Sequence, residues 1–171
     1  MRPNWDRHWM SAAELAAQMS TCASGRKVGA VFVRDKRLLA TGFNGVPSGY
    51  PHPESCIRRE RNIPSGEGLH LCVCAHAEAN GIANAARHGI RLVDATVYVT
   101  CQPCAMCMGA LANVGISKVM FAGDYPDDRT KDIADHAGIG LVRMSGSDDT
   151  ETGNADEAGA ACGRADTDCG C

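Results

Sequence analysis

Two short clusters of cysteine, histidine and glutamate constrain this chain more than any other feature of its sequence. The first is Cys74-Ala-His76-Ala-Glu78 and the second is Pro103-Cys104-Ala-Met-Cys107. A histidine and two cysteines at Cys-x-x-Cys spacing supply three ligands that suit tetrahedral zinc and leave its fourth position open, as in catalytic zinc sites. Cys104 and Cys107 are one helical turn apart, so both sulfur atoms can face one point. The sequence therefore predicts a zinc site shared by His76, Cys104 and Cys107.

Glu78 favours a catalytic over a structural role for this zinc. It follows His76 by two positions, close to the metal without having to bind it. A carboxylate there can take a proton from zinc-bound water, whose pKa zinc lowers to about 7. A Cys-x-x-Cys pair alone also occurs in structural zinc knuckles and redox motifs, and a histidine at a helix start is often a cap. A purely structural zinc would need a fourth protein ligand. Glu78 instead lies beside the metal without having to bind it, which leaves the fourth position open.

Length and cysteine content bound the class of protein. The chain has 171 residues and 18.0 kDa, the size of one ordinary domain with a tail. Ten cysteines would be dense for a secreted disulfide scaffold, but the first ten residues hold no apolar signal-peptide core and no run of 18 apolar residues occurs. We expect thiols and metal ligands in a reducing compartment, hence a cytoplasmic protein with no membrane partner.

Charge divides the chain at residue 145. Residues 145–171 carry seven acidic residues and one arginine, with no Leu, Ile, Val, Met or aromatic residue. Such a segment cannot bury enough apolar surface to offset its ordering entropy, so we predict a disordered acidic tail after a folded domain at residues 1–144. The domain alone has a net charge of +3 and the tail −6. A metal-binding role for the tail, through Cys162, Cys169 and Cys171, is an alternative.

Hydrophobic patterning within residues 1–144 alternates between helix and strand. We expect helices over 6–20, 77–88, 104–113 and 130–137, and strands over 28–33, 38–43, 95–100, 118–122 and 140–144. A Gly-, Pro-, Ser- and charge-rich insertion separates the first two strands from the next helix, over about 44–74. This order predicts an α/β class protein, a three-layer α/β/α fold around a five-stranded mixed sheet.

The motifs resemble a known family. His76-Ala-Glu78 with Pro103-Cys104-Ala-Met-Cys107 resembles the zinc signature of the cytidine deaminase superfamily. Five further segments resemble the deoxycytidylate (dCMP) deaminase family: Arg2-Pro-Asn-Trp5-Asp, Ser20-Thr-Cys22 with Val28-Gly-Ala-Val31, Gly42-Phe-Asn44-Gly-Val-Pro47-Ser-Gly49, Ser65-Gly-Glu67 and Gly123-Asp-Tyr125. The resemblance covers residues 2–144, leaves the tail out and implies the cytidine-deaminase-like fold.

The resemblance implies hydrolysis of dCMP to dUMP and ammonia, which supplies dUMP for thymidylate synthesis. A zinc-bound hydroxide would attack C4 of the base, and Glu78 would shuttle protons from the water to N3 and then to the leaving amine. Asn44 would hydrogen-bond the substrate and the backbone at Ala77 would contact the base edge. Among residues that could contact the 5′-phosphate, we expect Arg26 first, because a planar guanidinium suits phosphate better than an ammonium group, then Lys27, with Tyr125 as a hydroxyl donor.

A second, structural zinc is also implied, joining the Ser20-Thr-Cys22 segment to the insertion. The candidates for its four ligands are six residues: Cys22, His52, Cys56, His70, Cys72 and Cys74. We favour Cys22, Cys56 and Cys72 with His70 as the fourth ligand, and Cys74 competes because it lies two residues before His76. Free buried cysteines are the alternative.

The family resemblance further implies a homo-oligomer, a hexamer, activated by dCTP and inhibited by dTTP, with Mg²⁺ accompanying the effector. Two positions depart from the usual pattern. Phe43 replaces a tyrosine, and Cys101-Gln-Pro stands where a glutamate often precedes the proline, so we expect Cys101 to be a packed thiol. A tRNA adenosine deaminase, a free-base or nucleoside deaminase, or a non-catalytic zinc-stabilised binding module are the alternatives. The acidic tail and the insertion disfavour a tRNA enzyme, and we expect no nucleic-acid partner.

Overall fold

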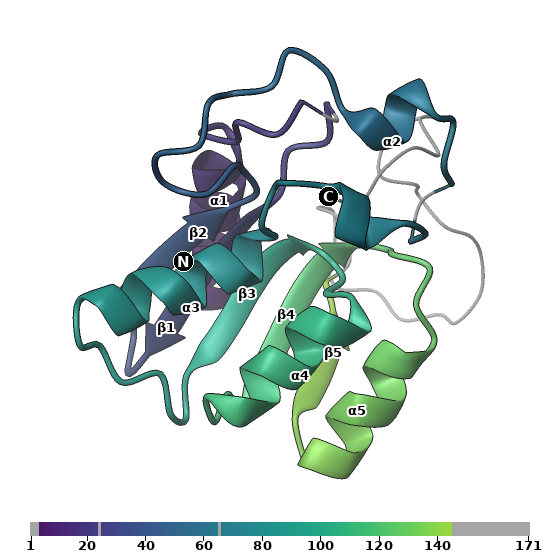
Figure 1. Cartoon of the computed structure of the whole chain (residues 1–171). Coiled ribbons are helices and arrows are strands. Elements are labelled where there is room, and N and C mark those ends of the chain that lie inside the picture. The colour runs from purple at the N-terminus through teal and green to yellow at the C-terminus, as the bar shows by residue number, and fades with distance from the viewer. Residues whose placement is uncertain (1–3, 24, 65, 145–171) are drawn as a thin grey trace.

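A mixed five-stranded sheet forms the centre of the computed structural model, which describes residues 4–23, 25–64 and 66–144. The strands are β1 (Gly29–Arg34), β2 (Arg37–Phe43), β3 (Thr96–Cys101), β4 (Lys118–Gly123) and β5 (Gly140–Arg143), in the spatial order β2-β1-β3-β4-β5. β1 is antiparallel to both β2 and β3, whereas β3, β4 and β5 run parallel. β2, β3 and β4 therefore end, and β1 begins, at the same edge of the sheet (Figure 1).

Helices cover both faces of this sheet. Helix α1 (Trp5–Ala17) packs on one face, and α3 (Ala77–Arg87), α4 (Ala105–Asn113) and α5 (Arg129–Ala137) lie on the other, as Figure 1 shows. Alternate residues of β1 point to opposite faces, so Val31 and Val33 contact α1 while Ala30 and Phe32 join the core under α3 and α4. The three-layer α/β/α fold with a five-stranded mixed sheet is confirmed.

Sequence explains why α1 forms and where it packs. The side chain of Asn4 caps its first turn by accepting a hydrogen bond from the backbone N–H of Arg7 (3.2 Å). Trp9, Met10, Ala13 and Ala17 are buried, the spacing of a helix with one apolar face.

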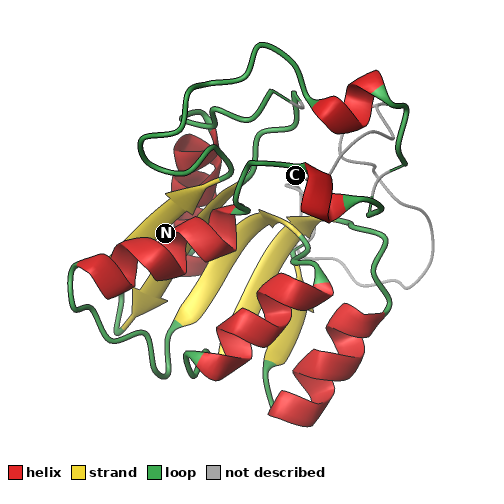
Figure 2. Cartoon of the chain, viewed as in Figure 1, coloured by secondary structure: helices red, strands yellow, loops and turns green. Residues whose placement is uncertain are grey.

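The insertion crosses the sheet edge at which β2, β3 and β4 end (Figure 2). Backbone hydrogen bonds between Gly45 and Ala75, of 3.1 and 2.9 Å, close its two ends together. It holds two short helices, α2 (Ile57–Glu60) and the 3₁₀ helix η1 (Leu69–Leu71), that the sequence analysis did not predict. Single helical turns are too short to show hydrophobic periodicity, which is why the pattern missed them.

The other expected elements are present, with ends that differ by up to three residues. The first helix, expected over 6–20, ends at Ala17, because the apolar spacing continues to Met19 although that side chain is exposed. The predicted tail, residues 145–171, lies outside the described residues. No helix in the described part of the chain is long and apolar enough to cross a membrane.

Close contact between β2 and α3 depends on a glycine. A Cβ atom on Gly42 would lie 2.1 Å from the carbonyl oxygen of Ala77 and 2.4 Å from the backbone nitrogen of Gly81. Both obstacles are backbone atoms of α3, so a side chain at position 42 would push this helix away from the sheet. The first turn of α3 carries Glu78, so this contact also sets the depth of that carboxylate.

We expect Gly42→Ala to lower the free energy of unfolding by about 3 kcal/mol, because backbone must move to admit the methyl group. Urea denaturation would measure the change. Gly109→Ala is the control: a Cβ on Gly109, within α4, would meet nothing within 4 Å. Alanine there should stabilise the protein by up to about 1 kcal/mol through helix propensity. Equal effects of the two substitutions would contradict the packing argument.

Candidate zinc and nucleotide site

Three predicted metal ligands converge where α3 and α4 begin. His76 is the N-cap of α3, Cys104 is the N-cap of α4, and Cys107 lies in the first turn of α4. The Nδ1 atom of His76 is 3.5 Å from Sγ of Cys104 and 3.3 Å from Sγ of Cys107. Ligands of one tetrahedral zinc ion would be about 3.6 Å apart, given bonds of 2.0–2.3 Å. The donor types and their separations therefore fit zinc, with the fourth position left to solvent or substrate.

Ionisation of the two thiols favours a cation between them. A hydrogen bond from Cys107 and a second from His76, opposed by burial, lower the pKa of Cys104 to about 4. The pKa of Cys107 is raised, because its thiol bonds to Cys104 and is buried beside Glu78. One thiolate thus forms readily while a second is disfavoured unless a positive ion compensates the charge. A zinc ion at this point supplies that compensation.

Glu78 lies in the first turn of α3, with 4% of its surface exposed. Burial raises the pKa of its carboxyl group, and the positive charge of His76 opposes this effect. A carboxyl group with a raised pKa is a stronger base than an ordinary carboxylate, so it accepts a proton more readily and can later return it. Its position and its pKa suit it to proton transfer beside the three ligands.

One cavity connects these groups. Its empty volume, which includes space open to solvent, is about 310 Å³. The functional side chains that line it are His76, Glu78, Cys104, Arg26, Cys101 and Tyr125, and Ala77 lines it too. The structure thus places Arg26, Ala77 and Tyr125, three of the five predicted substrate contacts, beside the zinc ligands.

Lys27 and Asn44, the other two predicted contacts, are not among the described residues that line this cavity. Lys27 is exposed, and its Nζ atom lies 3.5 Å from the carbonyl oxygen of Gln18. The expectation for Lys27 followed from its place just ahead of the first strand, which it shares with Arg26, but of the two Arg26 lines the cavity.

Asn44 is fully buried, and its side chain hydrogen-bonds to the backbone of the segment that contains Arg26. Its Nδ2 donates to the carbonyl oxygen of Arg26 (2.9 Å), and its Oδ1 accepts from the backbone N–H of Val28 (2.8 Å) and from Oγ of Ser20 (2.6 Å). The side chain therefore connects the end of β2 to the start of β1 at the cavity wall. A direct contact between Asn44 and substrate stays a prediction.

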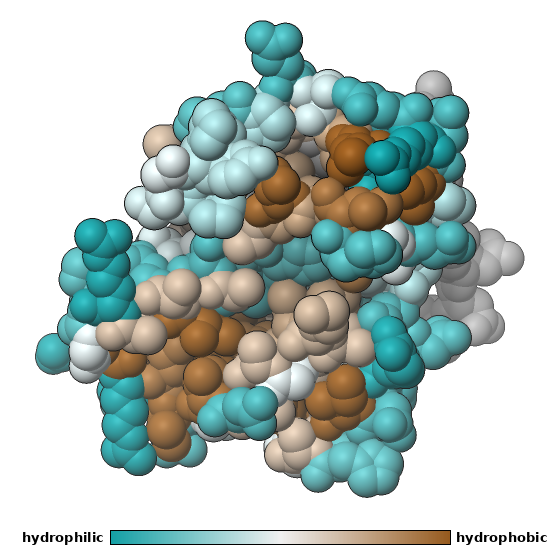
Figure 3. Space-filling view, in the orientation of Figure 1, coloured by the Kyte–Doolittle hydropathy of each residue, from teal (hydrophilic) through white to brown (hydrophobic). Residues whose placement is uncertain are grey.

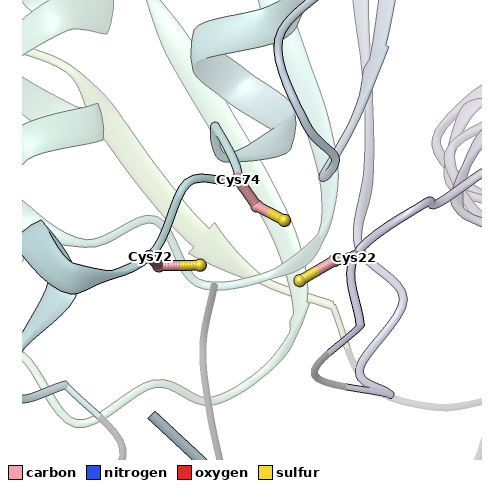
Figure 4. Close-up of side chains that lie close together, drawn as sticks. All are labelled: Cys22, Cys72 and Cys74. Carbon is pink, nitrogen blue, oxygen red and sulfur yellow. The ribbon is translucent and has the colours of Figure 1, made fainter. Parts of the chain in front are cut away.

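A second group of thiols lies beside the site. The sulfur atoms of Cys22, Cys72 and Cys74 are within 4.8 Å of one another, and Figure 4 shows the three side chains pointing towards one point. The buried Cys56 packs against them. Burial and the neighbouring thiols of Cys22 and Cys72 raise the pKa of Cys74.

This group includes Cys74, which the sequence analysis ranked below His70. His70 is exposed in η1 and is not a member. Because the backbone at Cys72 is extended, residues 72 and 74 point to the same side while Val73, 40% exposed, points to the other. The structure thus groups the thiols of Cys22, Cys72 and Cys74, with Cys56 adjacent, and the ligand set of a second metal stays a prediction.

Two residues that the sequence analysis missed hold the loop before α4. A carboxylate oxygen of Asp127 accepts a hydrogen bond from the backbone N–H of Ala105 (2.8 Å), and Oγ1 of the buried Thr130 donates to the carbonyl oxygen of Pro103 (2.8 Å). Asp127 thereby caps α4 from another segment, while the side chain of Cys104, the N-cap residue, makes no capping bond. The sequence signal was weak, since Asp-Asp-Arg-Thr before a helix indicates only a cap of its own helix.

Comparison with known proteins identifies relatives. Residues 3–123 match the model of the cytidine and deoxycytidylate deaminase zinc-binding region. The deoxycytidylate deaminase of Mycobacterium phage D29 is 40% identical over 125 residues, which span 70% of this chain and 95% of the phage protein. That of Saccharomyces cerevisiae is 36% identical over 149 residues, 85% of this chain, but this chain spans only 46% of the yeast protein.

A solved structure agrees with both the fold and the family. The dCMP deaminase of cyanophage S-TIM5, in complex with dCMP and dUMP, superposes with a TM-score of 0.69 at 28% identity, covering 84% of this chain and 99% of that one. The family model covers the segments that bring His76, Glu78, Cys104 and Cys107 together. The chain therefore belongs to the zinc-dependent cytidine and deoxycytidylate deaminase family.

Proposed function

We propose that this protein is a dCMP deaminase, which hydrolyses dCMP to dUMP and ammonia. The observation that carries the proposal is the group of three zinc-type ligands, His76, Cys104 and Cys107, beside one cavity that is also lined by the buried carboxyl group of Glu78 and by the cation of Arg26. Deamination needs the first two, and a 5′-monophosphate needs the third. The phage and yeast relatives bear the name of this activity.

His76, Cys104 and Cys107 would hold the zinc, which when bound activates a water molecule by lowering its pKa. Glu78 accepts a proton as the water attacks C4 of cytosine and passes it to N3, which makes C4 more electrophilic. It then takes the proton of the new C4 hydroxyl group and delivers it to the departing amino group, so that ammonia leaves and the C4 carbonyl forms. The raised pKa of Glu78 supports both directions of transfer.

The groups around Glu78 would orient the substrate. Ala77 precedes Glu78 and lines the cavity, so its backbone is available to the base edge. Arg26 would bind the 5′-phosphate and Tyr125 would donate its hydroxyl hydrogen. Burial raises the pKa of Tyr125 to about 12, so the hydroxyl keeps its proton at neutral pH.

We infer that a structural zinc binds Cys22, Cys72 and Cys74, with Cys56 as the fourth ligand. The three clustered thiols come from the segment after α1 and from the end of the insertion, so a shared ion would fix the insertion to the domain. Ser20, two residues before Cys22, bonds to Asn44, and Cys74 lies two residues before His76. A metal here would therefore stabilise two segments that reach the cavity.

Assembly and regulation follow from the family resemblance. We infer a homo-oligomer, a hexamer as in that family, whose effectors are dCTP and dTTP with Mg²⁺. Apolar side chains that remain exposed support assembly: Met106 is 76% exposed at the start of α4, and Figure 3 shows brown apolar surface between α3 and α4.

Glu78→Gln tests the proposed chemistry. The amide cannot carry the proton, so we expect kcat for ammonia release from dCMP to fall by about 10²–10⁴-fold with zinc content unchanged. Glu14→Gln, an exposed carboxylate on α1, is the matched control and should keep wild-type activity. Wild-type protein should prefer dCMP to deoxycytidine, dCTP and tRNA adenosine. If protein with full zinc occupancy released no ammonia from dCMP, the proposed function would be wrong.

Cys72→Ser tests the second metal. We expect wild-type protein to hold two zinc ions per chain and the variant one, measured by elemental analysis of the same preparations. The melting temperature should also fall, because metal binding contributes folding energy. Cys101→Ser is the control, since Cys101 belongs to neither thiol group among the described residues, and should leave the count at two. One zinc ion in both wild type and Cys72→Ser would contradict the site.

A further inference from the structure

The guanidinium of Arg26 is held at the cavity wall by two uncharged acceptors. Its Nη2 atom is 2.8 Å from Sγ of Cys101 and 3.3 Å from the carbonyl oxygen of Asp124. These acceptors lie side by side because Cys101, the last residue of β3, pairs with Gly123, the last residue of β4. Sγ of Cys101 is in turn 3.5 Å from the Asp124 carbonyl oxygen. The register of β3 against β4 therefore places both acceptors of the Arg26 guanidinium close together.

No carboxylate among the described residues forms an ion pair with Arg26. The side chain of Asp124, the residue whose carbonyl oxygen contacts Arg26, is paired with Arg143 instead, at 2.8 Å between Oδ2 and Nη2. Asp124 thus offers Arg26 its backbone oxygen, while its charge is compensated elsewhere. Arg26 keeps its full positive charge towards the cavity.

The identity of residue 101 matters for this charge. Cys101 is 6% exposed and lines the cavity. A thiol is a weak, neutral acceptor, so it restrains the guanidinium without cancelling its charge. An aspartate at the same place would form a charge-assisted pair with Arg26 and compete with an anionic ligand.

A second polar group in the same cavity points to an anion. Tyr125 follows Asp124 directly, is 7% exposed and lines the cavity. Its Oη atom is buried and has no hydrogen-bond partner among the described residues. A buried hydroxyl left in this state costs free energy unless a ligand accepts its hydrogen. Arg26 and Tyr125 together present a charge and a donor, the pair that a phosphate oxygen requires.

We propose that Cys101 is a positioning residue, an uncharged partner that orients Arg26 so that its charge faces the 5′-phosphate of the nucleotide. This role rests on the proposed dCMP deaminase function and names a determinant of preference for the monophosphate over the nucleoside. In that function it acts through Arg26 and not on the reacting C4 atom.

The test compares dCMP with deoxycytidine, which lacks the phosphate, in Cys101→Ala, Cys101→Ser and Cys101→Asp. With Cys101→Ala we expect the ratio of kcat/KM for dCMP to that for deoxycytidine to fall about 5–10-fold, through KM for dCMP rather than kcat, since one hydrogen bond to a charged group is lost. Cys101→Ser should restore most of the ratio, because a hydroxyl also accepts. Cys101→Asp should reduce it further, by about 30-fold or more, since a carboxylate neutralises Arg26.

Binding supplies a readout that is independent of turnover. Binding of the product dUMP, measured by calorimetry, should weaken across the Cys101 variants in the same order as the kinetic ratio, and binding of deoxyuridine should change less. Melting temperature and zinc content show whether each variant is folded. Equal losses for dCMP and deoxycytidine, or an unchanged ratio in Cys101→Asp, would overturn the positioning role. An unchanged ratio in Arg26→Ala would overturn it as well. Failure of wild-type protein to deaminate dCMP would reject the proposed function itself, a result separate from any effect at position 101.

Discussion

The chemistry of this domain depends on two helices that begin at the same point. His76 and Cys104 occupy the N-cap positions of α3 and α4, and neither side chain forms an N-cap hydrogen bond with its own helix. An N-cap side chain normally satisfies a free backbone N–H, so using it as a metal ligand leaves that donor to another partner. For α4 the partner is Asp127, from the segment before α5. The helix N-termini also carry partial positive charge, which favours thiolate and carboxylate at the site.

The mixed sheet explains how distant segments reach those helix ends. Parallel β3 and β4 place the loops after Cys101 and Gly123 at one edge, and antiparallel β1 and β2 bring residues 26–28 and Asn44 to the same edge. Asn44 then joins the end of β2 to the start of β1 through its side-chain amide. Close packing at Gly42 brings α3 to the depth that this edge requires. The site is thus a consequence of strand direction as much as of the motifs.

Sequence patterning predicted the fold and the grouping of the catalytic motif, but not the orientation of single side chains. Periodicity reports which residues are buried over several turns or strand positions, which sufficed for the nine long elements among the described residues. It cannot report on α2 and η1, each a single turn. Periodicity also fails to choose between residues that are close in sequence: Arg26 rather than Lys27 lines the cavity, and Cys74 rather than His70 joins the thiol group. Those choices follow from local backbone conformation and long-range packing.

Charge placement around the cavity favours an anionic ligand even though acidic residues are close. Asp124 pairs with Arg143, and Asp127 is engaged by the N–H of Ala105 and by Arg129. The carboxylates of Asp124 and Asp127 are therefore compensated by groups other than Arg26. Glu78, in the same cavity, is buried, and burial raises the pKa of its carboxyl group. The Arg26 guanidinium, hydrogen-bonded to the Cys101 sulfur and the Asp124 carbonyl oxygen, is left facing the cavity without a carboxylate partner among the described residues. A negatively charged ligand would compensate this positive charge.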